Sequence, residues 1–462
     1  MKLWGIGAAL LSGALLAVSR DTGQFGWLVL VAPVPLLVYA LRAPKALSAL
    51  GPVFGLAFLA GLMGEAGPMW FYGRVLPLIY GLAVYQALMF ALAVLFLRGL
   101  YHRVSPAAAV LGFAAMTAAV EYLYGLVSPN GSFGALGYTL VDVLPLLQTA
   151  SLAGVAGLTF LAALIPAGLA VLCLKPRDVT ALVVWAVPVL AALAYGFWQL
   201  AQPMGPSLRI ALLSDDRYAG RIYDHPEAGP EIAASFTAQI AHAAAQKPAA
   251  IVIPEKMLAA GTELTADSVV VAGLDGLVKG VRLNIAALYR PGVPTQTYLK
   301  KRMVPGLEAE YRPGHDELLT RMDGQSVGVA ICKDMDFASD MRLYGRRDVG
   351  LMLVPAWDFD RDRYLHGRMA VVRSVENGFS LARSASRGLM TLNDSKGRII
   401  AEKRTRKGPS MLVGDLPTGH GQTVYSRTGD VFAQAMLALW LGMLALLARC
   451  RIIGVSHLRE NA

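Results

Sequence analysis

The chain has 462 residues, of which 55% are hydrophobic and only 16% are charged. This composition excludes an ordinary soluble enzyme and indicates a membrane protein with more than one domain. The formal net charge is +10, but no basic and aromatic motif accompanies it, so we do not expect the chain to bind nucleic acid.

The first 200 residues contain several apolar runs close to the ~20 residues that a membrane-spanning helix needs. We predict a seven-helix transmembrane domain over residues 1–200 and a C-terminal transmembrane helix over residues 430–448. No clear small-residue cleavage site follows the first run, so we interpret it as a retained helix and not as a signal peptide. The predicted crossings are residues 3–18, 26–41, 46–64, 77–97, 106–126, 148–174, 179–199 and 430–448.

The positive residues of the short loops predict the orientation, because Lys and Arg are retained on the cytoplasmic side of a membrane. With the N-terminus inside, the outer loops carry only Arg20 and Arg74. This pattern places residues 200–429 outside the cytoplasm. The predicted inner residues are Lys2, Arg42, Lys45, Arg98, Arg103, Lys175, Arg177, Arg449, Arg451 and Arg459.

Residues 207–429 have the composition of a soluble domain. Short apolar runs of strand type alternate there with amphipathic helical patterns, which is typical of helices covering a sheet. We therefore predict a layered α/β domain. The predicted strands are residues 209–214, 249–254, 268–273, 284–289, 326–332, 351–355 and 380–383, and the predicted helices are residues 230–246 and 361–376.

Cys332 is the only cysteine of this domain, since Cys173 and Cys450 fall in or beside the predicted membrane helices. No disulfide can therefore form within the domain. A lone thiol of this kind is either a buried packing residue or a nucleophile.

Two further reactive side chains also follow predicted strands, and they favour the second alternative. Glu255 comes after the apolar residues 251–254, and Lys300 comes shortly after Tyr298. Active sites of α/β domains form beyond the ends of strands, so these side chains can share a pocket with Cys332. A thiol needs a base before it attacks a carbonyl, and an ammonium can stabilise the resulting oxyanion. The three residues thus predict acyl transfer through a thioester.

Each residue also has a purely structural interpretation. Glu255 could cap a helix, Lys300 could belong to a solvated basic run with Lys301 and Arg302, and Cys332 could pack in a strand. The joint occurrence of the three motifs favours the catalytic interpretation. No cluster of His, Cys or Asp has the spacing of metal ligands, so we expect neither a metal nor another cofactor.

These motifs resemble the Glu-Lys-Cys triad of the nitrilase, or carbon-nitrogen hydrolase, superfamily. Together with the flanking apolar helices they resemble more closely the bacterial apolipoprotein N-acyltransferase family. The resemblance implies a multi-helix transmembrane domain plus an α/β nitrilase-type domain, an αββα sandwich. It rests on Glu255, residues 298–308, Ile331, Cys332, Asp334, His366, Arg373, residues 376–378, Arg383 and residues 425–430.

The resemblance also implies roles for individual residues. Glu255 is expected to be the general base, Lys300 the oxyanion stabiliser and Cys332 the nucleophile. An accessory acid is expected at Glu308 or at Glu310, and the sequence leaves both open.

Trp357 and His366 are expected to contact the substrate. For His366, a position in the core or on the surface is an equally good interpretation.

The implied reaction transfers a fatty acyl chain from a phospholipid to the N-terminal amine of a lipoprotein diacylglyceryl-cysteine. We expect a monomer in the bacterial inner membrane, with the catalytic domain in the periplasm. Two departures keep open a membrane-anchored carbon-nitrogen hydrolase or amidase, or an acyltransferase with another amine acceptor. The acyltransferases usually have an aromatic residue and Glu after the nucleophile, whereas Lys333 and Asp334 follow Cys332 in this chain. Residues 354–359 stand where the acyltransferases have an Asn-Asp-Ala-Trp-Phe segment.

Lys333 itself allows two interpretations. Its charge could lower the pKa of the neighbouring thiol, or its side chain could point into solvent, and we favour the second. A transporter or sensor is disfavoured, because few ionisable residues lie within the predicted helices and both Glu65 and Glu121 fall near outer helix ends.

Overall fold

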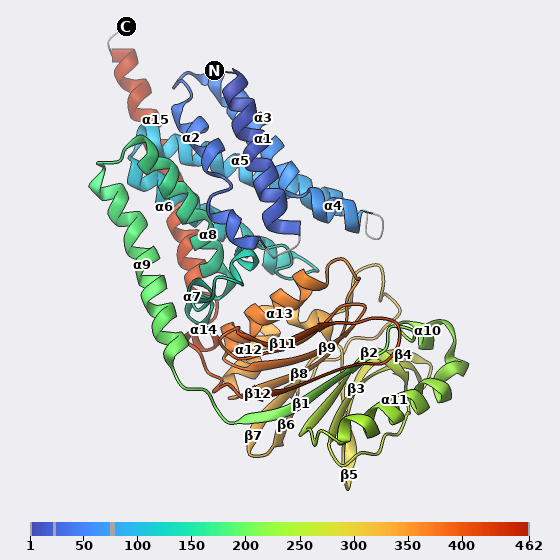
Figure 1. The fold of residues 1–462 in the computed structure, drawn as a ribbon. Coiled ribbons are helices and arrows are strands. Elements are labelled where there is room, and N and C mark those ends of the chain that lie inside the picture. Colours follow the sequence, from blue (N-terminus) through green and yellow to red (C-terminus); the bar gives the residue numbers. More distant parts are fainter. Residues whose placement is uncertain (1, 22–24, 74–78, 461–462) are drawn as a thin grey trace. The chain divides into compact units, whose positions relative to one another are not determined.

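The computed structural model describes residues 2–21, 25–73 and 79–460 (Figure 1). The chain forms two compact units. The first comprises Met1–Val127, Gly134–Trp198 and Asp430–Ala462, and the second comprises Ser128–Phe133 and Gln199–Gly429. The packing of residues 128–133 with the second unit was not predicted from the sequence.

The first unit is helical. Among the described residues, 7 helices are long and apolar enough to cross a membrane, and a shorter apolar segment, Gly26–Arg42, stands where another crossing was predicted. The chain is a membrane protein. Arg74 and the first residues of the predicted crossing 77–97 lie outside the described residues. The elements are α1 (Lys2–Asp21), η1 (Gly26–Leu30), α2 (Val34–Arg42), η2 (Leu47–Ala49), α3 (Leu50–Gly64), α4 (Ala66–Tyr72), α5 (Ile79–Arg103), α6 (Pro106–Val127), η3 (Leu136–Leu140), α7 (Leu144–Leu147), α8 (Ala150–Leu174), α9 (Val179–Ala201) and α15 (Val431–Glu460).

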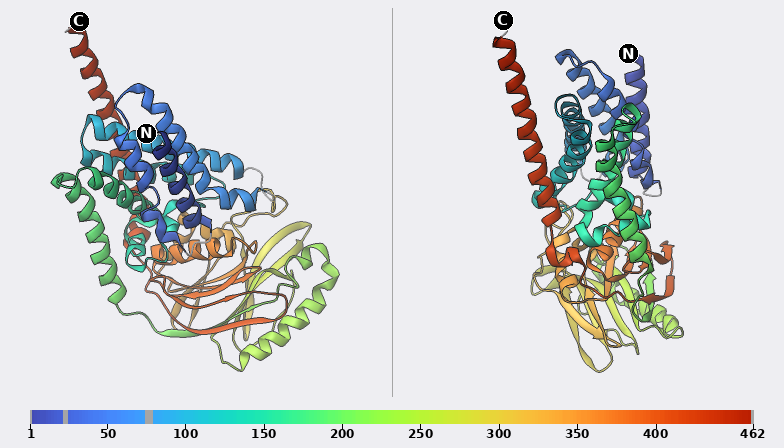
Figure 2. Two further views of the ribbon diagram at one scale, coloured as in Figure 1. Left: turned by 45° about the horizontal axis from the view of Figure 1, so that its top comes forward. Right: turned by 90° about the vertical axis from the view of Figure 1, so that its left-hand side faces the viewer.

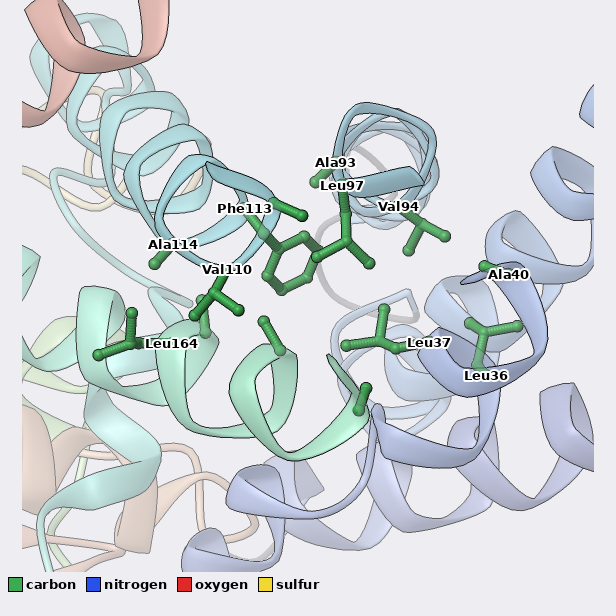
Figure 3. Close-up of a cluster of buried hydrophobic side chains, with 14 of the residues drawn as sticks. Leu36, Leu37, Ala40, Ala93, Val94, Leu97, Val110, Phe113, Ala114 and Leu164 are labelled. Carbon is green, nitrogen blue, oxygen red and sulfur yellow. The ribbon is translucent and has the colours of Figure 1, made fainter. Parts of the chain in front are cut away.

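The short helix α2 packs inside the helical unit. Its Leu36 and Leu37 are fully buried and belong to the same cluster as Leu97 of α5, Val110 of α6 and Leu164 of α8 (Figure 3). Many of the remaining members are alanines, whose small side chains let helices approach closely, as is usual between helices in membranes.

Two arginines of the helical unit, Arg20 and Arg98, have partners within it. Arg20 forms an ion pair with Glu65 at 2.7 Å. Arg98 is buried and donates to the backbone oxygen of Ala43 at 2.9 Å, just beyond the C-terminus of α2. The guanidinium there satisfies carbonyl groups that the helix itself cannot pair.

The second unit contains two six-stranded sheets. The first has the strand order β12-β1-β2-β3-β4-β5, and the second has the order β11-β10-β9-β8-β7-β6. In each sheet the central strands are parallel and the outer pairs are antiparallel. The strands are β1 (Ser207–Ser214), β2 (Ala250–Ala259), β3 (Val269–Val278), β4 (Val281–Arg290), β5 (Val293–Leu299), β6 (Leu318–Met322), β7 (Gln325–Val329), β8 (Leu351–Trp357), β9 (Ser380–Ser386), β10 (Leu389–Asn393), β11 (Ile399–Arg404) and β12 (Ser410–Pro417).

The two sheets pack face to face, and helices cover their outer faces (Figures 1 and 2). The core between the sheets joins residues such as Val252 of the first sheet and Leu353 of the second. Phe236 of α11 packs on the first sheet, and Ala370 of α13 packs on the second. This αββα sandwich confirms the predicted fold class. The helices are α10 (Arg221–Asp224), η4 (Pro226–Ala228), α11 (Gly229–Ala244), η5 (Cys332–Asp336), α12 (Ala338–Arg346), α13 (Arg363–Asn377) and α14 (Val424–Thr428).

Candidate active site

The three predicted catalytic residues come from three separate strands or strand ends. Glu255 lies within β2, Lys300 follows the last residue of β5, and Cys332 begins η5 shortly after β7. Two details differ from expectation. First, β2 continues past Glu255, so this residue caps no helix. Second, the strand before Lys300, β5, exposes most of its residues and is not a buried apolar strand.

Lys300 sits between two carboxylates. Its Nζ lies 2.7 Å from Oε1 of Glu255 and 2.7 Å from Oε2 of Glu308. Asn284 of β4 donates to both acids, at 2.7 Å to Glu255 and 3.0 Å to Glu308. All four side chains are buried. Lys300 therefore does not belong to a solvent-exposed basic segment.

Of the two candidates for the accessory acid, Glu308 lies in this cluster. Its Oε2 also accepts from the backbone N–H of Val304 at 2.9 Å, which fixes the carboxylate in place. Glu310 is exposed and hydrogen-bonds Tyr223 instead.

The backbone of β2 is irregular where it carries Glu255. The pairing of β2 with β3 shifts register between Ile253 and Leu258, and Lys256 has a φ of 54°. Gly273 on β3 makes room for this bulge, since a Cβ there would lie 2.3 Å from the carbonyl oxygen of Pro254. Bulges commonly redirect side chains beside active sites.

Cys332 occupies a sharp turn from strand to helix. Its φ is 42°, a left-handed conformation that is strained for a residue with a side chain. The thiol donates to the backbone oxygen of Trp357 over 3.5 Å. A turn of this kind resembles the nucleophile elbow, which presents a reactive side chain at the end of a sheet.

The surroundings of Cys332 favour the neutral thiol at rest. Burial raises its pKa well above the ordinary value, and the charge of Glu255 raises it further. The charges of Lys300 and Arg383 act in the opposite direction. Attack therefore requires a base close to the sulfur, since the thiolate is the nucleophile.

The charges of the cluster hold one another ionised. Burial alone would lower the pKa of Lys300, but Glu255 and Glu308 outweigh it and hold that pKa well above its usual value. Burial would raise the pKa of Glu308, but Lys300 and Lys256 hold it at about 2. Lys300 is thus a permanent cation and Glu308 a permanent anion at neutral pH.

Asp334 ties the turn of Cys332 to the segment that carries Lys300. Its carboxylate accepts from the hydroxyl of Tyr298 at 2.8 Å, from the N–H of Ile331 at 3.0 Å and from the N–H of Arg302 at 2.8 Å. Burial raises the pKa of Asp334 to about 6. Through these hydrogen bonds Asp334 holds the turn of Cys332 against the segment that carries Lys300.

Lys333 is buried, so the expectation that it points into solvent is wrong. Its Nζ donates to Oδ1 of Asn130 at 2.9 Å and lies 3.2 Å from Asp336. Ser132 of the same loop donates to the backbone oxygen of Asp336 at 3.0 Å and accepts from Arg373 at 2.8 Å. The loop 128–133 thereby braces the turn that follows Cys332.

The two predicted substrate contacts lie in different surroundings. Trp357 ends β8, and its ring centroid lies 5.1 Å from Nζ of Lys256. His366 on α13 is flanked by aromatic rings, with Nδ1 3.2 Å from Asp362 and 3.8 Å from Asp358. Asp358 in turn accepts from Arg383 at 3.0 Å.

Sequence reasoning missed Lys256 and Asn284. Lys256 lies 2.7 Å from Glu308, and Asn284 bridges the two acids. A polar residue inside a buried strand pattern was the available signal for Asn284. Within the described part of the chain, no group of His, Cys, Asp and Glu could hold a metal ion.

A family model described as the apolipoprotein N-acyltransferase N-terminal domain matches residues 12–168. The apolipoprotein N-acyltransferase of Geobacter metallireducens is 28% identical to this chain, and the match covers 93% of this chain and 92% of that protein. The chain is thus similar to apolipoprotein N-acyltransferases over most of its length. The resemblance indicated by the motifs is confirmed.

Further similarities extend across the chain and to solved structures. The apolipoprotein N-acyltransferase of Rhodopseudomonas palustris is 25% identical, over 96% of this chain and 94% of that protein. A solved amidase of the nitrilase superfamily from Nesterenkonia has 19% identity and a TM-score of 0.39, and the match covers 51% of this chain and 98% of the amidase.

Proposed function

We propose that this protein transfers a fatty acyl chain from a phospholipid to the N-terminal amine of a lipoprotein diacylglyceryl-cysteine, through a thioester on Cys332. The observation that carries the proposal is the buried cluster of Glu255, Lys300 and Glu308 beside Cys332. Similarity to apolipoprotein N-acyltransferases supports the choice of substrates.

In the first half-reaction the sulfur of Cys332 attacks the ester carbonyl carbon of the phospholipid. Glu255 takes the thiol proton as the C–S bond forms, and Lys300 stabilises the oxyanion. The ester C–O bond then breaks, and Glu255 returns the proton to the departing oxygen. A lysophospholipid leaves, and the acyl chain remains on Cys332.

In the second half-reaction the lipoprotein amine attacks the thioester carbonyl carbon. Glu255 accepts a proton from the amine, the C–S bond breaks, and the proton returns to the sulfur. Glu308 keeps its place throughout as an anchor of Lys300. All four groups come from one chain, so a monomer suffices.

The first test is mass spectrometry of the purified protein after exposure to phospholipid. An acyl adduct is expected on Cys332, and Cys332→Ala should lack it while remaining inserted and folded. Lys300→Ala or Glu255→Ala should slow its formation by roughly 10²–10³, as loss of an oxyanion donor or base generally does. Cys173→Ala is the control, because Cys173 lies outside the second unit, which contains Cys332 and is called the catalytic unit below. Turnover that persists in Cys332→Ala would exclude the covalent mechanism.

A second test separates transfer from hydrolysis. The enzyme is loaded with labelled phospholipid, freed of excess donor, and given either a diacylglyceryl-cysteine peptide or buffer. Acyl label on the peptide amine, with lysophospholipid released before the peptide is added, is the expected ping-pong result. Free fatty acid formed at the same rate with and without peptide would favour the hydrolase alternative.

A further inference from the structure

The candidate site contains a second buried ammonium, that of Lys256. Its Nζ lies 2.7 Å from Oε1 of Glu308, and its side chain is 11% exposed. The same nitrogen lies 4.9 Å from the ring centroid of Tyr311 and 5.1 Å from that of Trp357. One carboxylate and two aromatic faces therefore surround this cation.

The backbone is bent to bring Lys256 there. In a regular strand successive side chains point to opposite faces, so Lys256 would point away from Glu255. The left-handed φ of 54° at Lys256, inside the bulge of β2, breaks this alternation. Both side chains consequently reach the cluster around Glu308. A strained conformation of this kind costs about 1–3 kcal/mol and persists only where the surrounding structure enforces it.

Acids outnumber cations around the thiol, and Lys256 reduces this excess. The carboxylates are those of Glu255, Glu308, Asp358 and Asp334, and the cations are Lys300, Lys256 and Arg383, while Lys333 is paired with Asp336. His366 lies next to Asp358 at the rim of the group. Without Lys256, two acids would share the single charge of Lys300, and any negative charge on the sulfur or on an oxyanion would add to an existing excess.

We propose that Lys256 is a positioning residue that neutralises Glu308 and so leaves the charge of Lys300 available to Glu255 and to the anion formed during acylation. The proposal rests on the proposed role of Cys332 as the nucleophile. It predicts that Lys256 controls the ease with which the thiol loses its proton, although Lys256 contacts Glu308 and not the sulfur.

The test is the rate at which iodoacetamide alkylates Cys332 in the full-length protein in detergent, measured from pH 6 to 10 on the peptide containing Cys332. Lys256→Met is expected to slow alkylation at pH 7 by about tenfold or more and to shift the pH profile upward by about one pH unit, since one pKa unit changes the thiolate fraction tenfold. Lys256→Arg keeps the charge and should stay within about threefold of the unmodified protein.

Lys301→Met is the matched control, because it removes a cation adjacent in sequence to Lys300 that pairs with Glu317 at 2.6 Å. The dependence of the alkylation rate on pH should be the same in Lys301→Met as in the unmodified protein. The proposal is overturned if Lys256→Met shows no shift, or if Lys256→Arg is slowed as much as Lys256→Met.

The double variant Lys256→Met with Glu308→Gln removes one charge of each sign and should recover most of the rate lost in Lys256→Met. A double variant as slow as Lys256→Met would also overturn the proposal. Alkylation needs no lipid, so a shifted profile in a protein that forms no thioester from phospholipid would reject the proposed function and leave the role of Lys256 standing.

Discussion

At the scale of single residues, the unusual feature is a carboxylate that is buried and yet permanently charged. Glu308 is reached by Lys300, by Lys256, by the amide of Asn284 and by the N–H of Val304. Its pKa of about 2 lies below the ordinary 4.5. A lowered pKa means that the carboxylate stabilises the fold above pH 4.5 and that this contribution is lost as the pH falls from 4.5 toward 2.

Glu308→Gln is therefore expected to destabilise the catalytic unit by roughly 3–5 kcal/mol at pH 7, because Lys256 loses its carboxylate partner and Lys300 keeps only Glu255. The difference from the unmodified protein should shrink as the pH falls below 4.5. Thermal unfolding in detergent micelles measures both effects. Glu317→Gln, which removes a partly exposed ion pair with Lys301, should change stability by less than about 1 kcal/mol. Equal unfolding temperatures for Glu308→Gln and the unmodified protein at pH 7 would show that the charge of Glu308 does not stabilise the fold.

The residues that sequence reasoning found and missed differ in a physical way. Glu255 follows a predicted strand, Cys332 ends one, and Lys300 stands in a short motif with Tyr298, so local sequence was enough to find these three residues. Asn284 reaches the acids only because β4 pairs with β3 and β5, and Lys256 only because β2 bulges. Long-range pairing and local strain leave no periodic signal in a single sequence.

At the scale of elements, the sequence predicted the interior strands and missed the edges. The seven predicted strands correspond to β1, β2, β3, β4, β7, β8 and β9. The four edge strands β5, β6, β11 and β12 were all missed, along with β10. Interior strands are buried on both faces and appear as continuous apolar runs, whereas edge strands such as β5 expose most of their residues.

The bulge of β2 gives a prediction at this scale. A Cβ at Gly273 would lie 2.4 Å from Cα of Glu255, so Gly273→Ala must displace the bulge that carries Glu255 and Lys256. We expect a loss of about 1–3 kcal/mol, as for other overpacked sites, together with slower acylation of Cys332.

Gly367→Ala is the control, because a Cβ at Gly367 in α13 meets no atom within 4 Å. Alanine favours a helix over glycine by up to about 1 kcal/mol, so this variant should be neutral or more stable. Thermal unfolding and the yield of acyl adduct compare the two variants. Full activity in Gly273→Ala would show that the bulge does not position the site.

At the scale of the whole molecule, residues 128–133 constrain the membrane topology. Asn130 contacts Lys333 within the catalytic unit, so residues 128–133 and 199–429 must lie on the same side of the membrane. The helices α8 and α9 connect them, and both are long and apolar enough to cross. Two crossings return the chain to its starting side, which agrees with the topology predicted from the loop charges.

The paired arginines sharpen the charge argument for orientation. Arg20, on the predicted outer side, is neutralised by Glu65 at 2.7 Å, and Arg98, on the predicted inner side, is buried against backbone carbonyls. The remaining inner loops carry more positive residues than the outer loops, where Arg74 is the other one. The inner residues are Arg42, Lys45, Arg103, Lys175 and Arg177. The bias toward the cytoplasmic side therefore survives when Arg20 and Arg98 are left out of the count.

Reporter fusions measure this topology directly. Fusions truncated after residues 130 and 203 are expected to be active only outside the cytoplasm, and fusions after residues 176 and 455 only inside. If the fusions at positions 130 and 203 report the same side, the number of crossings between them is even. The side that they report tests the orientation predicted from the loop charges. A cytoplasmic signal at both would reverse the orientation and contradict the expected periplasmic position of residues 200–429. Opposite signals at 130 and 203 would contradict the contact between Asn130 and Lys333.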